Sequence, residues 1–488
     1  MDEGGLSYMT QQGIRYAQSP QYSDGVAVPR IGEVPSQYAD QPSRGHTCVI
    51  GAGLAGLAVA KTLRGRNSTF SVLEQTTDVG GLWHSAGSGA PSPGYASLHL
   101  NTSSKVSGFS DFPMPNGYPR YPRHDLVAEY LSDFADEFGL REHIRFGVEV
   151  VEVAPNPDSG WNVRTRDTAT GREEILMFQH VVVATGHHSH PKWPEPAIPG
   201  AEQFPGAQLH SYEYFSPADH VGKRVVVAGF GNSAADVSVD LSRLASKTYL
   251  SIRRSLHVVP KTMLGIPIDE IASKGWWARM GFDDQRRFVE VVLRVIRGRL
   301  ADYGIPEPDH RIFSSPVTIS DELLSRISHG DITVKPAIDR FDGSAVCFSD
   351  GTRVEADAVV YCTGYRIAFP FLPGEWFRDS TGQIALYHRV IPPGRPGLYF
   401  AGLIRPVGSI TRLLEGQAEW IADLVDGSAG LPHTKEMITE IERHLAAARQ
   451  RYGPTEIDSI QVDFAPYLES LLSERRARAG SCCAGSTR

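Results

Sequence analysis

The sequence predicts an α/β fold with two parallel-sheet units, because the same pattern of segments occurs twice. A short apolar run that suits a buried strand is followed by a glycine-rich turn, by apolar residues at helical spacing, and by a second apolar run. Strand, turn, helix and strand in this order form the unit of a doubly wound sheet. The segments are residues 47–50, 54–63 and 70–73 in the first unit, and 225–228, 233–244 and 249–252 in the second.

The glycine-rich turns carry the fingerprint of sites for dinucleotide phosphates. The first glycine allows a tight turn, the second lets a pyrophosphate approach the backbone, and the third allows close packing of helix against strand. The helix that starts there directs free amide groups and its positive dipole end at the phosphate. The sequence therefore predicts two Rossmann-like dinucleotide-binding domains. The turns are Gly51-Ala52-Gly53-Leu54-Ala55-Gly56 and Gly229-Phe230-Gly231-Asn232-Ser233-Ala234, and the fingerprint allows Ala234 in its last position.

The residues after the second strand of each unit have opposite charge. Glu74 stands where a carboxylate accepts hydrogen bonds from free ribose hydroxyls. Arg253 and Arg254 stand at the matching point of the second unit, where a guanidinium suits a 2′-phosphate, with Lys261 as a further candidate. A solvated surface pair is the alternative for the two arginines. This asymmetry predicts a redox enzyme with two cofactors and favours NADPH over NADH in the second unit.

Composition excludes several classes of protein. The formal net charge of -8 at pH 7 argues against nucleic-acid binding. The sequence has no apolar run of about 20 residues, which a membrane-spanning helix needs. Asp2 and Glu3 stand where a signal peptide would have a basic start and an apolar stretch. We therefore expect a cytoplasmic protein without a membrane anchor.

Cysteines and clustered histidines do not predict a metal site. The 5 cysteines include no CxxC motif. Cys482-Cys483 resembles the tail of mercuric reductases, but the paired redox cysteines that such enzymes need beside the first fingerprint are absent, which favours a disordered tail. The histidines at 187, 188 and 190 follow a strand into a proline-rich linker, so we expect polar loop contacts there.

The order of segments predicts an insertion of the second unit within the first domain. Apolar strand-like runs at 181–186 and 358–365 bracket the second fingerprint and suit crossovers between domains. A helical stretch at 283–299 either packs on the second domain or covers a substrate channel. The expected parts are a flexible extension (1–45), a first domain (46–200), a second domain (201–345) with a helical insertion near 262–310, the rest of the first domain (346–430), and a helical extension with a flexible tail (431–488).

The stretch from Phe204 to Tyr214, Phe-Pro-Gly-Ala-Gln-Leu-His-Ser-Tyr-Glu-Tyr, fits the FxGxxxHxxxY motif, and with it the chain resembles the flavin-containing monooxygenases. His210 within it suits a structural turn. Related Baeyer–Villiger enzymes carry tryptophan where this chain has Tyr214, which favours heteroatom oxygenation. Further matches are Gly80-Gly81-Leu82-Trp83, Asn101-Thr102-Ser103, Phe109-Ser110-Asp111-Phe112-Pro113, Ala184-Thr185-Gly186 and Thr363-Gly364-Tyr365.

The resemblance implies specific cofactor contacts. FAD would be held by the first fingerprint, Glu74 and the segment Gly81, Leu82 and Trp83, with Val150 near the adenine and Gln417 near the isoalloxazine. NADPH would be held by Gly229, Gly231, Asn232, Ser233, Ala234, Arg253 and Arg254. Asn101 matches the active-site asparagine of the family, whose amide can orient a peroxide without offering it an acidic proton.

The function implied by the resemblance is oxygen transfer from a flavin hydroperoxide to a nitrogen or sulfur of a small organic molecule, with molecular oxygen as co-substrate. Alternatives are a Baeyer–Villiger or oxidative-decarboxylating enzyme acting on a ketone or 2-oxo acid, and an NADPH oxidase without substrate. A catalytically silent NADPH-sensing protein is the alternative from another class. The resemblance also suggests a homodimer.

Overall fold

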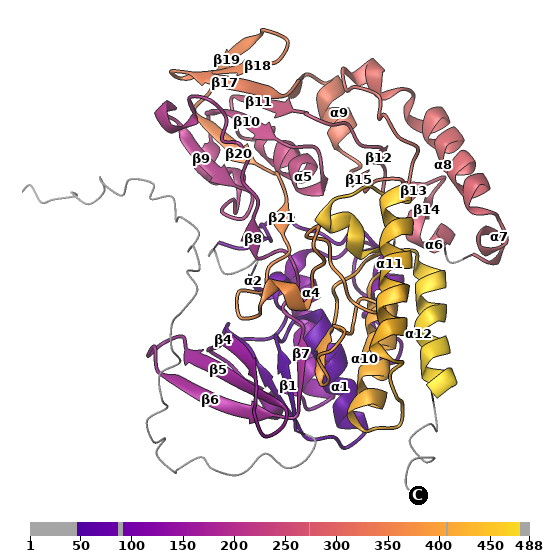
Figure 1. Ribbon diagram of the computed structural model, residues 1–488. Helices are drawn as coiled ribbons and strands as arrows, with labels where there is room; N and C mark the ends of the chain where they lie inside the picture. The colour runs from indigo at the N-terminus through magenta and orange to yellow at the C-terminus, as the bar shows by residue number, and fades with distance from the viewer. Residues whose placement is uncertain (1–45, 86–90, 273, 407, 479–488) are drawn as a thin grey trace, which may run out of the picture. The chain divides into compact units, whose positions relative to one another are not determined.

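The computed structural model describes residues 46–85, 91–272, 274–406 and 408–478 (Figure 1). The expected N-terminal extension at 1–45 and the pair Cys482-Cys483 lie outside the described residues. Within the described ranges, no helix has both the length and the apolar character needed to cross a membrane.

The first fingerprint belongs to a parallel five-stranded sheet. The strand order is β22-β7-β1-β2-β3, and every neighbouring pair is parallel. Helices α1 and α10 pack together, and buried Trp420 of α10 joins the same apolar core. The bounds are β1 Thr47–Ile50, α1 Leu54–Gly65, β2 Phe70–Leu73, α2 Leu82–Ser85, α3 Ser104–Ser107, α4 His124–Glu137, β3 Ile144–Arg145, β7 His180–Val183, β22 Leu398–Phe400 and α10 Thr411–Val425.

A three-stranded antiparallel sheet is inserted between the strands of this domain, in the order β4-β5-β6. Its bounds are β4 Val148–Pro155, β5 Trp161–Asp167 and β6 Glu173–Phe178. Buried and half-buried residues alternate along most of β5, as expected for a sheet with one face on the core. The buried face packs on the first sheet through Val148, Val163 and Phe178.

The second fingerprint belongs to a second parallel sheet with the order β16-β11-β10-β20-β9. All residues of β20 and most of β10 are buried, as in a parallel sheet that is covered on both faces. The predicted α/β fold with two dinucleotide-type sheets is thereby confirmed. The bounds are β9 Ala207–His210, β10 Arg224–Ala228, α5 Asn232–Leu241, β11 Lys247–Ser251, α9 Leu323–Ser328, β16 Ile332–Lys335 and β20 Ala358–Tyr361.

The second sheet continues past the expected boundary at residue 345. That boundary falls at the start of β18, the central strand of the small antiparallel sheet β17-β18-β19, and β20 then pairs with β10 and β9 of the second sheet. The chain returns to the first domain after β20, because this strand is needed to complete the second sheet. The bounds are β17 Ile338–Asp342, β18 Ala345–Phe348 and β19 Arg353–Glu355.

The two linkers between the sheets pair with each other. Strand β8 (His190–Pro191) in the outgoing linker is antiparallel to β21 (Tyr365–Arg366) in the returning one. The Lys192 amide also donates to the Gly364 carbonyl at 2.9 Å. Since both connections form one short ribbon, the linkers act as a paired crossover.

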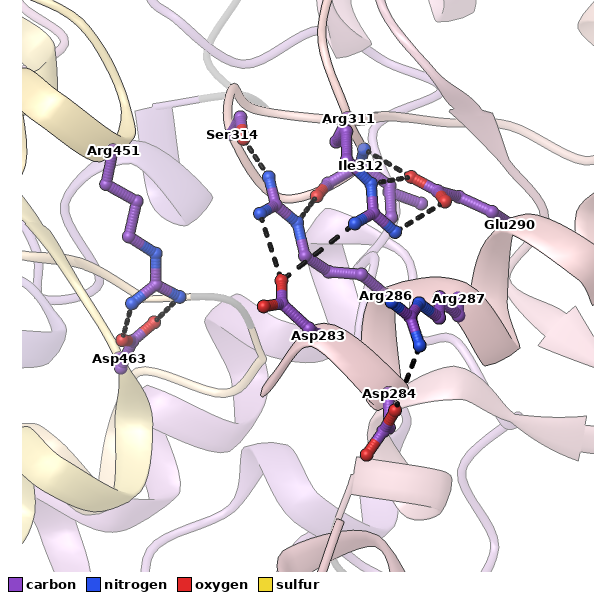
Figure 2. A network of polar contacts seen from close by, with 10 residues as sticks. All are labelled: Asp283, Asp284, Arg286, Arg287, Glu290, Arg311, Ile312, Ser314, Arg451 and Asp463. Atoms are coloured by element: carbon purple, nitrogen blue, oxygen red, sulfur yellow. Dashed lines mark hydrogen bonds and ion pairs between the residues drawn. The ribbon is translucent and has the colours of Figure 1, made fainter. Parts of the chain in front are cut away.

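Residues 258–319, between β11 and α9, form an insertion built around helix α8. Val289 and Leu293 of α8 are buried against Val259, Met263 and Ile312. Figure 2 shows how charged contacts fix the same helix: Arg286 donates to the Ile312 carbonyl at 2.8 Å and to Ser314, and Glu290 pairs with Arg311. The bounds are β12 Val258–Val259, β13 Thr262–Met263, β14 Ile266–Pro267, α6 Ile268–Ala272, α7 Gly275–Ala278, α8 Phe282–Arg297 and β15 Thr318–Ile319.

The C-terminal helices pack on the first domain. Helix α12 contacts α10, and strand β24 pairs in parallel with β23, which follows β22. Buried Met437, Ile441 and Leu445 of α11 belong to the core around α1. The bounds are β23 Arg405–Pro406, α11 Thr434–Arg451, β24 Gln461–Val462 and α12 Phe464–Arg478.

Candidate functional site

The first fingerprint turn has two glycines that the fold itself requires. Gly51 has φ +103°, and a Cβ there would lie 2.9 Å from the Ala184 carbonyl oxygen of the neighbouring strand end. A Cβ at Gly56 would lie 1.8 Å from the Gly51 oxygen. Glycine at these positions therefore lets strand, turn and helix pack closely, as the fingerprint predicts.

The middle glycine has open space before it instead. A Cβ at Gly53 would meet nothing closer than Gly81 Cα at 3.7 Å. Gly53 is the N-cap of α1, where no side chain caps the helix and the first turn has no acidic residue. Its free amide groups are therefore available to an anion such as a pyrophosphate.

Glu74 lies at the carboxyl end of β2 beside this turn and is buried. One carboxylate oxygen accepts from the Ala52 amide at 2.7 Å, and the other accepts from the amide and hydroxyl of Thr76, both at 2.8 Å. A carboxylate offers about four acceptor positions, so a further one remains for a ribose hydroxyl. The contacts thus orient Glu74 toward the fingerprint turn.

The segment after Glu74 closes on the fingerprint. The Gly80 amide donates to the Ala52 carbonyl at 3.0 Å. Gly81 has φ +55°, and a Cβ on it would lie 3.1 Å from Gly53 Cα. Leu82 begins α2, and Trp83 packs against the core of the first domain. The segment therefore lies directly beside the candidate pyrophosphate site.

Val150 and Gln417, which are expected near the adenine and the isoalloxazine of FAD, lie in different elements of the first domain. Val150 is buried in β4, next to the first sheet. Gln417 is fully buried in α10, where its amide oxygen accepts from the Gly402 amide at 2.8 Å and its nitrogen donates to the Tyr467 hydroxyl at 2.7 Å. These bonds fix the segment after β22 to α10 and α12, and a contact of Gln417 with the isoalloxazine stays a prediction.

The second fingerprint repeats the design of the first. Gly229 has φ +141°, and a Cβ there would lie 2.4 Å from the Cys362 oxygen, just past β20. A Cβ at Gly231 would meet no atom within 4 Å, and α5 starts there without a side-chain cap or a first-turn acid. Ala234 is fully buried. The turn therefore also presents free amide groups to an anion.

Two residues of this turn differ in their contacts. The Asn232 side-chain oxygen accepts from the Ile319 amide at 2.8 Å and so ties the turn to β15. Ser233 is half-buried in the first turn of α5. Asn232 therefore has a structural contact, and cofactor binding by both residues stays a prediction.

Arg253 and Arg254 follow β11 and are exposed. The Arg254 guanidinium lies 3.5 Å from the Ser315 hydroxyl and 3.9 Å from Asp309, at the outer limits for such contacts. Neither arginine is committed to a tight ion pair among the described residues. Both side chains are thus accessible to a phosphate beside the second fingerprint.

Asn101 lies on a loop of the first domain that residues of the second domain hold in place. Lys261 donates from its ammonium to the Leu100 carbonyl at 3.0 Å. One Asp269 oxygen accepts from the amide and the hydroxyl of Ser103 at 2.7 and 2.8 Å. The half-buried Asn101 side chain makes no hydrogen bond with the described residues. Its amide is therefore available to ligands while its backbone is fixed.

Lys261 therefore contacts the Asn101 loop, in addition to any role toward a phosphate. Burial lowers the pKa of its ammonium, against the attraction of Asp236 and other acids. Asp236 of α5 accepts from the Tyr95 hydroxyl at 2.6 Å, and burial raises its pKa to about 6. Sequence patterns did not single out Tyr95, Asp236 or Asp269, because their partners come from distant segments.

The motif histidine has a structural role. His210 is fully buried, accepts from the Tyr212 amide through Nδ1 at 3.1 Å, and can donate through Nε2 to the Gly364 carbonyl at 3.0 Å. Burial lowers its pKa to about 4. His210 thus holds the returning linker, as expected. Tyr214 lies in the core of the second domain, with its ring centroid 6.0 Å from that of His220.

Within the described residues, no three side chains of histidine, cysteine, aspartate or glutamate group as a metal site would require. The three described cysteines, Cys48, Cys347 and Cys362, are buried and free. Burial raises the pKa of Cys362 to about 12, so its thiol is inert at neutral pH.

Comparison with known proteins agrees with this geometry. A family described as Flavin-binding monooxygenase-like matches residues 45–480. Flavin-containing monooxygenase 5 of Oryctolagus cuniculus is 35% identical over 441 residues, covering 87% of this chain and 81% of the relative. Dimethylaniline monooxygenase [N-oxide-forming] 2 of Rattus norvegicus is 33% identical over 444 residues, covering 88% and 82%.

Solved structures extend the comparison. S-allyl-L-cysteine S-oxygenase from Allium sativum has 25% identity and a TM-score of 0.66, covering 88% of both chains. An open structure of cyclohexanone monooxygenase has 18% identity and a TM-score of 0.65, covering 88% of this chain and 97% of that one, which shows the shared fold. The family model matches nearly the whole described chain, and both fingerprints have the open middle glycine that a dinucleotide site needs. The chain therefore belongs to the flavin-binding monooxygenase-like family.

Proposed function

We propose that this chain uses NADPH, FAD and molecular oxygen to insert one oxygen atom at a nitrogen or sulfur of a small organic substrate. Two electrons from NADPH reduce the other oxygen atom to water. Family membership supports this proposal, as do the names of an N-oxide-forming relative and of a structurally similar S-oxygenase.

The observation that carries the proposal is the placement of the Asn101 loop. Contacts from Lys261 and Asp269 hold this first-domain loop against the insertion of the second domain. A reaction that passes electrons from a nicotinamide to a flavin needs one site that residues of both domains build. The bridged loop supports such a site at Asn101.

Each group of residues has a proposed task. Bound FAD supplies the redox and oxygen chemistry, since no protein side chain activates molecular oxygen at such a site. The uncapped starts of α1 and α5 bind the two pyrophosphates, Glu74 binds a ribose, and Arg253 with Arg254 binds the 2′-phosphate. The Asn101 amide donates and accepts hydrogen bonds at the reacting oxygen.

Oxygen insertion into a ketone and oxidative decarboxylation of a 2-oxo acid remain the alternatives, since cyclohexanone monooxygenase shares the fold. Tyr214 does not separate these chemistries directly, because its ring packs in the core of the second domain. A homodimer is part of the proposal, and its test is the molar mass in solution.

The experiment is product analysis with purified, FAD-loaded protein, NADPH and a panel of tertiary amines, thioethers and ketones. The proposal expects N-oxides or sulfoxides in proportion to the NADPH consumed. Esters from the ketones as the main products would establish the alternative. Hydrogen peroxide equal to the NADPH consumed with every substrate would identify an oxidase and refute the proposal.

A further inference from the structure

Arg405 lies at the ligand-binding edge of the first sheet. It follows β22, whose neighbour β7 ends at Val183 and leads to His187 and His188. The same edge carries the Gly51 turn, which packs against Ala184 just after β7. Ligands of doubly wound sheets bind beyond the carboxyl ends of the strands. Arg405 and the two histidines are therefore in the region where cofactor and substrate meet.

The Arg405 guanidinium has no ion pair or hydrogen bond with the residues that the structure describes, although the side chain is half-buried. Burial lowers its pKa, and the charge of Asp458 acts in the opposite direction. The Asp458 carboxylate is engaged, because it accepts from the Thr455 amide at 3.1 Å and from the Thr455 hydroxyl. A desolvated cation without a committed partner is costly unless an anion joins it.

Two other sheltered arginines among the described residues have an acidic partner. Buried Arg389 pairs with Glu440 at 3.2 Å. Arg66 lies 2.5 Å from Asp423 and 2.9 Å from Asp426. Since no carboxylate of the described residues pairs with Arg405, an anion for it would come from a ligand.

The side chains near Arg405 are neutral and partly unsatisfied. Burial, the neighbouring His188 and the charge of Arg405 hold the pKa of the half-buried His187 well below its usual range, so this imidazole is neutral at pH 7, whereas the His188 side chain is exposed. The ring centroids of His187 and His188 lie 4.3 Å apart, and His188 lies 5.3 Å from Tyr365. His187 Nδ1 and the Tyr365 hydroxyl are buried without a hydrogen-bond partner. The cluster thus offers one cation and free polar groups to a ligand.

We propose that Arg405 binds a carboxylate of the molecule that is oxygenated, and that His187 and His188 complete this subsite. A planar guanidinium binds a carboxylate through two parallel hydrogen bonds, which fixes orientation as well as charge. This inference rests on the proposed function and names its substrate class: amines or thioethers that carry a carboxylate. A cofactor phosphate offers the same anionic chemistry, and the test separates the two sources.

The test compares 3-(methylthio)propanoate with its methyl ester, which has the same sulfur and no charge. For wild type we expect kcat/KM to be higher for the acid. In Arg405→Gln the acid-to-ester ratio should fall about 10- to 100-fold, because a charge-assisted contact is lost, and Arg405→Lys should restore part of it. Arg412→Gln, which removes an exposed arginine paired with Glu415, is the matched control and should leave the ratio as in wild type.

A second measurement does not depend on turnover. Titration of the oxidised holoenzyme with 3-(methylthio)propanoate, followed by flavin absorbance and by calorimetry, should give a Kd that rises in Arg405→Gln by a similar factor. Absence of binding to wild type, or an acid-to-ester ratio that Arg405→Gln does not change, overturns the inference. Arg405→Gln could instead lose FAD, or be reduced more slowly by NADPH without oxygen, while it binds the carboxylate as wild type does. This result would assign Arg405 to a cofactor and would also overturn the inference. Carboxylate binding without oxygenation of any substrate would refute the proposed function alone.

Discussion

The guanidinium carbon of Arg451 lies 3.8 Å from the ring centroid of Phe282. This contact joins the last residue of α11 to the first residue of α8, and so connects the C-terminal helices to the insertion in the second domain. Arg286 lies over the same ring at 5.0 Å. Figure 2 shows Arg451 paired with Asp463, so this carboxylate also holds the cation in place.

Replacing Phe282 by leucine should weaken the connection while keeping an apolar side chain. We expect a loss of about 0.5 to 2 kcal/mol in the free energy of unfolding, the range of a cation–π contact from exposed to desolvated sites. The measurement is a double-mutant cycle with Arg451→Met by urea unfolding. Additive effects of the two substitutions would show that the contact contributes no coupling energy.

The two kinds of glycine in the first fingerprint predict two kinds of defect. In Gly51→Ala we expect a loss of stability of about 2 kcal/mol or more, because the new Cβ would clash with Ala184 at a positive φ. Gly53→Val should keep its stability in the FAD-free form and lose FAD, since the space before this residue is open in the protein. Chemical unfolding of the FAD-free proteins and the ratio of flavin to protein absorbance measure the two effects. A Gly53→Val protein that stays fully loaded with FAD would contradict the assignment.

Local patterns in the sequence were sufficient for the parts of the fold that local residues determine. Both fingerprint turns and their strands were predictable, because a buried parallel strand is a short apolar run and each first glycine is required by its own turn. The end of the second domain was not predictable, because the position of β20 depends on pairing with β10, a distant strand. An apolar run alone does not identify its partner strand.

For the candidate site, the sequence indicated single residues but not the contacts that hold them in place. The resemblance gave Asn101, but the residues that hold its loop come from the insertion. Gln417 was expected near the flavin, whereas the contacts of its amide with Gly402 and Tyr467 depend on how α12 packs. Such side-chain contacts across distant segments leave no periodic signal in the sequence.

The two arginines after β11 should determine the preference between the nicotinamide cofactors. Replacing Arg253 and Arg254 together by glutamine should raise the ratio of the KM for NADPH to the KM for NADH. The increase should correspond to about 1 to 3 kcal/mol of lost binding free energy. Both side chains are exposed, so folding should not suffer. Steady-state kinetics with both cofactors is the measurement, and Arg243→Gln, whose arginine pairs with Glu322 at 2.6 Å, is the control. An unchanged NADPH preference in the double variant would place the phosphate site elsewhere.

Asp236 should make stability depend on pH. Burial raises its pKa to about 6, above the value for an unfolded chain, while the Tyr95 hydroxyl and Lys261 act in the opposite direction. The folded protein therefore retains a proton that the unfolded chain loses, so the contribution of this group is present below about pH 4 and is lost by about pH 6. Over that interval we expect a loss of about 2 kcal/mol relative to Asp236→Asn.

Urea unfolding of wild type and Asp236→Asn across this interval provides the measurement. The exposed Asp158 is the matched position, because Asp158→Asn removes the same charge at the surface. Parallel pH profiles for wild type and Asp236→Asn would contradict the prediction.

Asn101 should separate flavin reduction from oxygen transfer. Its loop is fixed through Leu100 and Ser103, neither of which depends on the Asn101 side chain, so Asn101→Ala should keep the loop in place. Anaerobic reduction by NADPH should then proceed, whereas product yield should fall by about 10-fold or more and hydrogen peroxide should replace it, because the amide no longer orients the reacting oxygen. Rapid-mixing reduction, product yield and peroxide yield are the measurements.

Thr102→Val, which alters the neighbouring side chain bonded to Ser107 at 2.8 Å, controls for disturbance of the loop. An Asn101→Ala enzyme with full product yield per NADPH would show that this amide has no part in oxygen transfer.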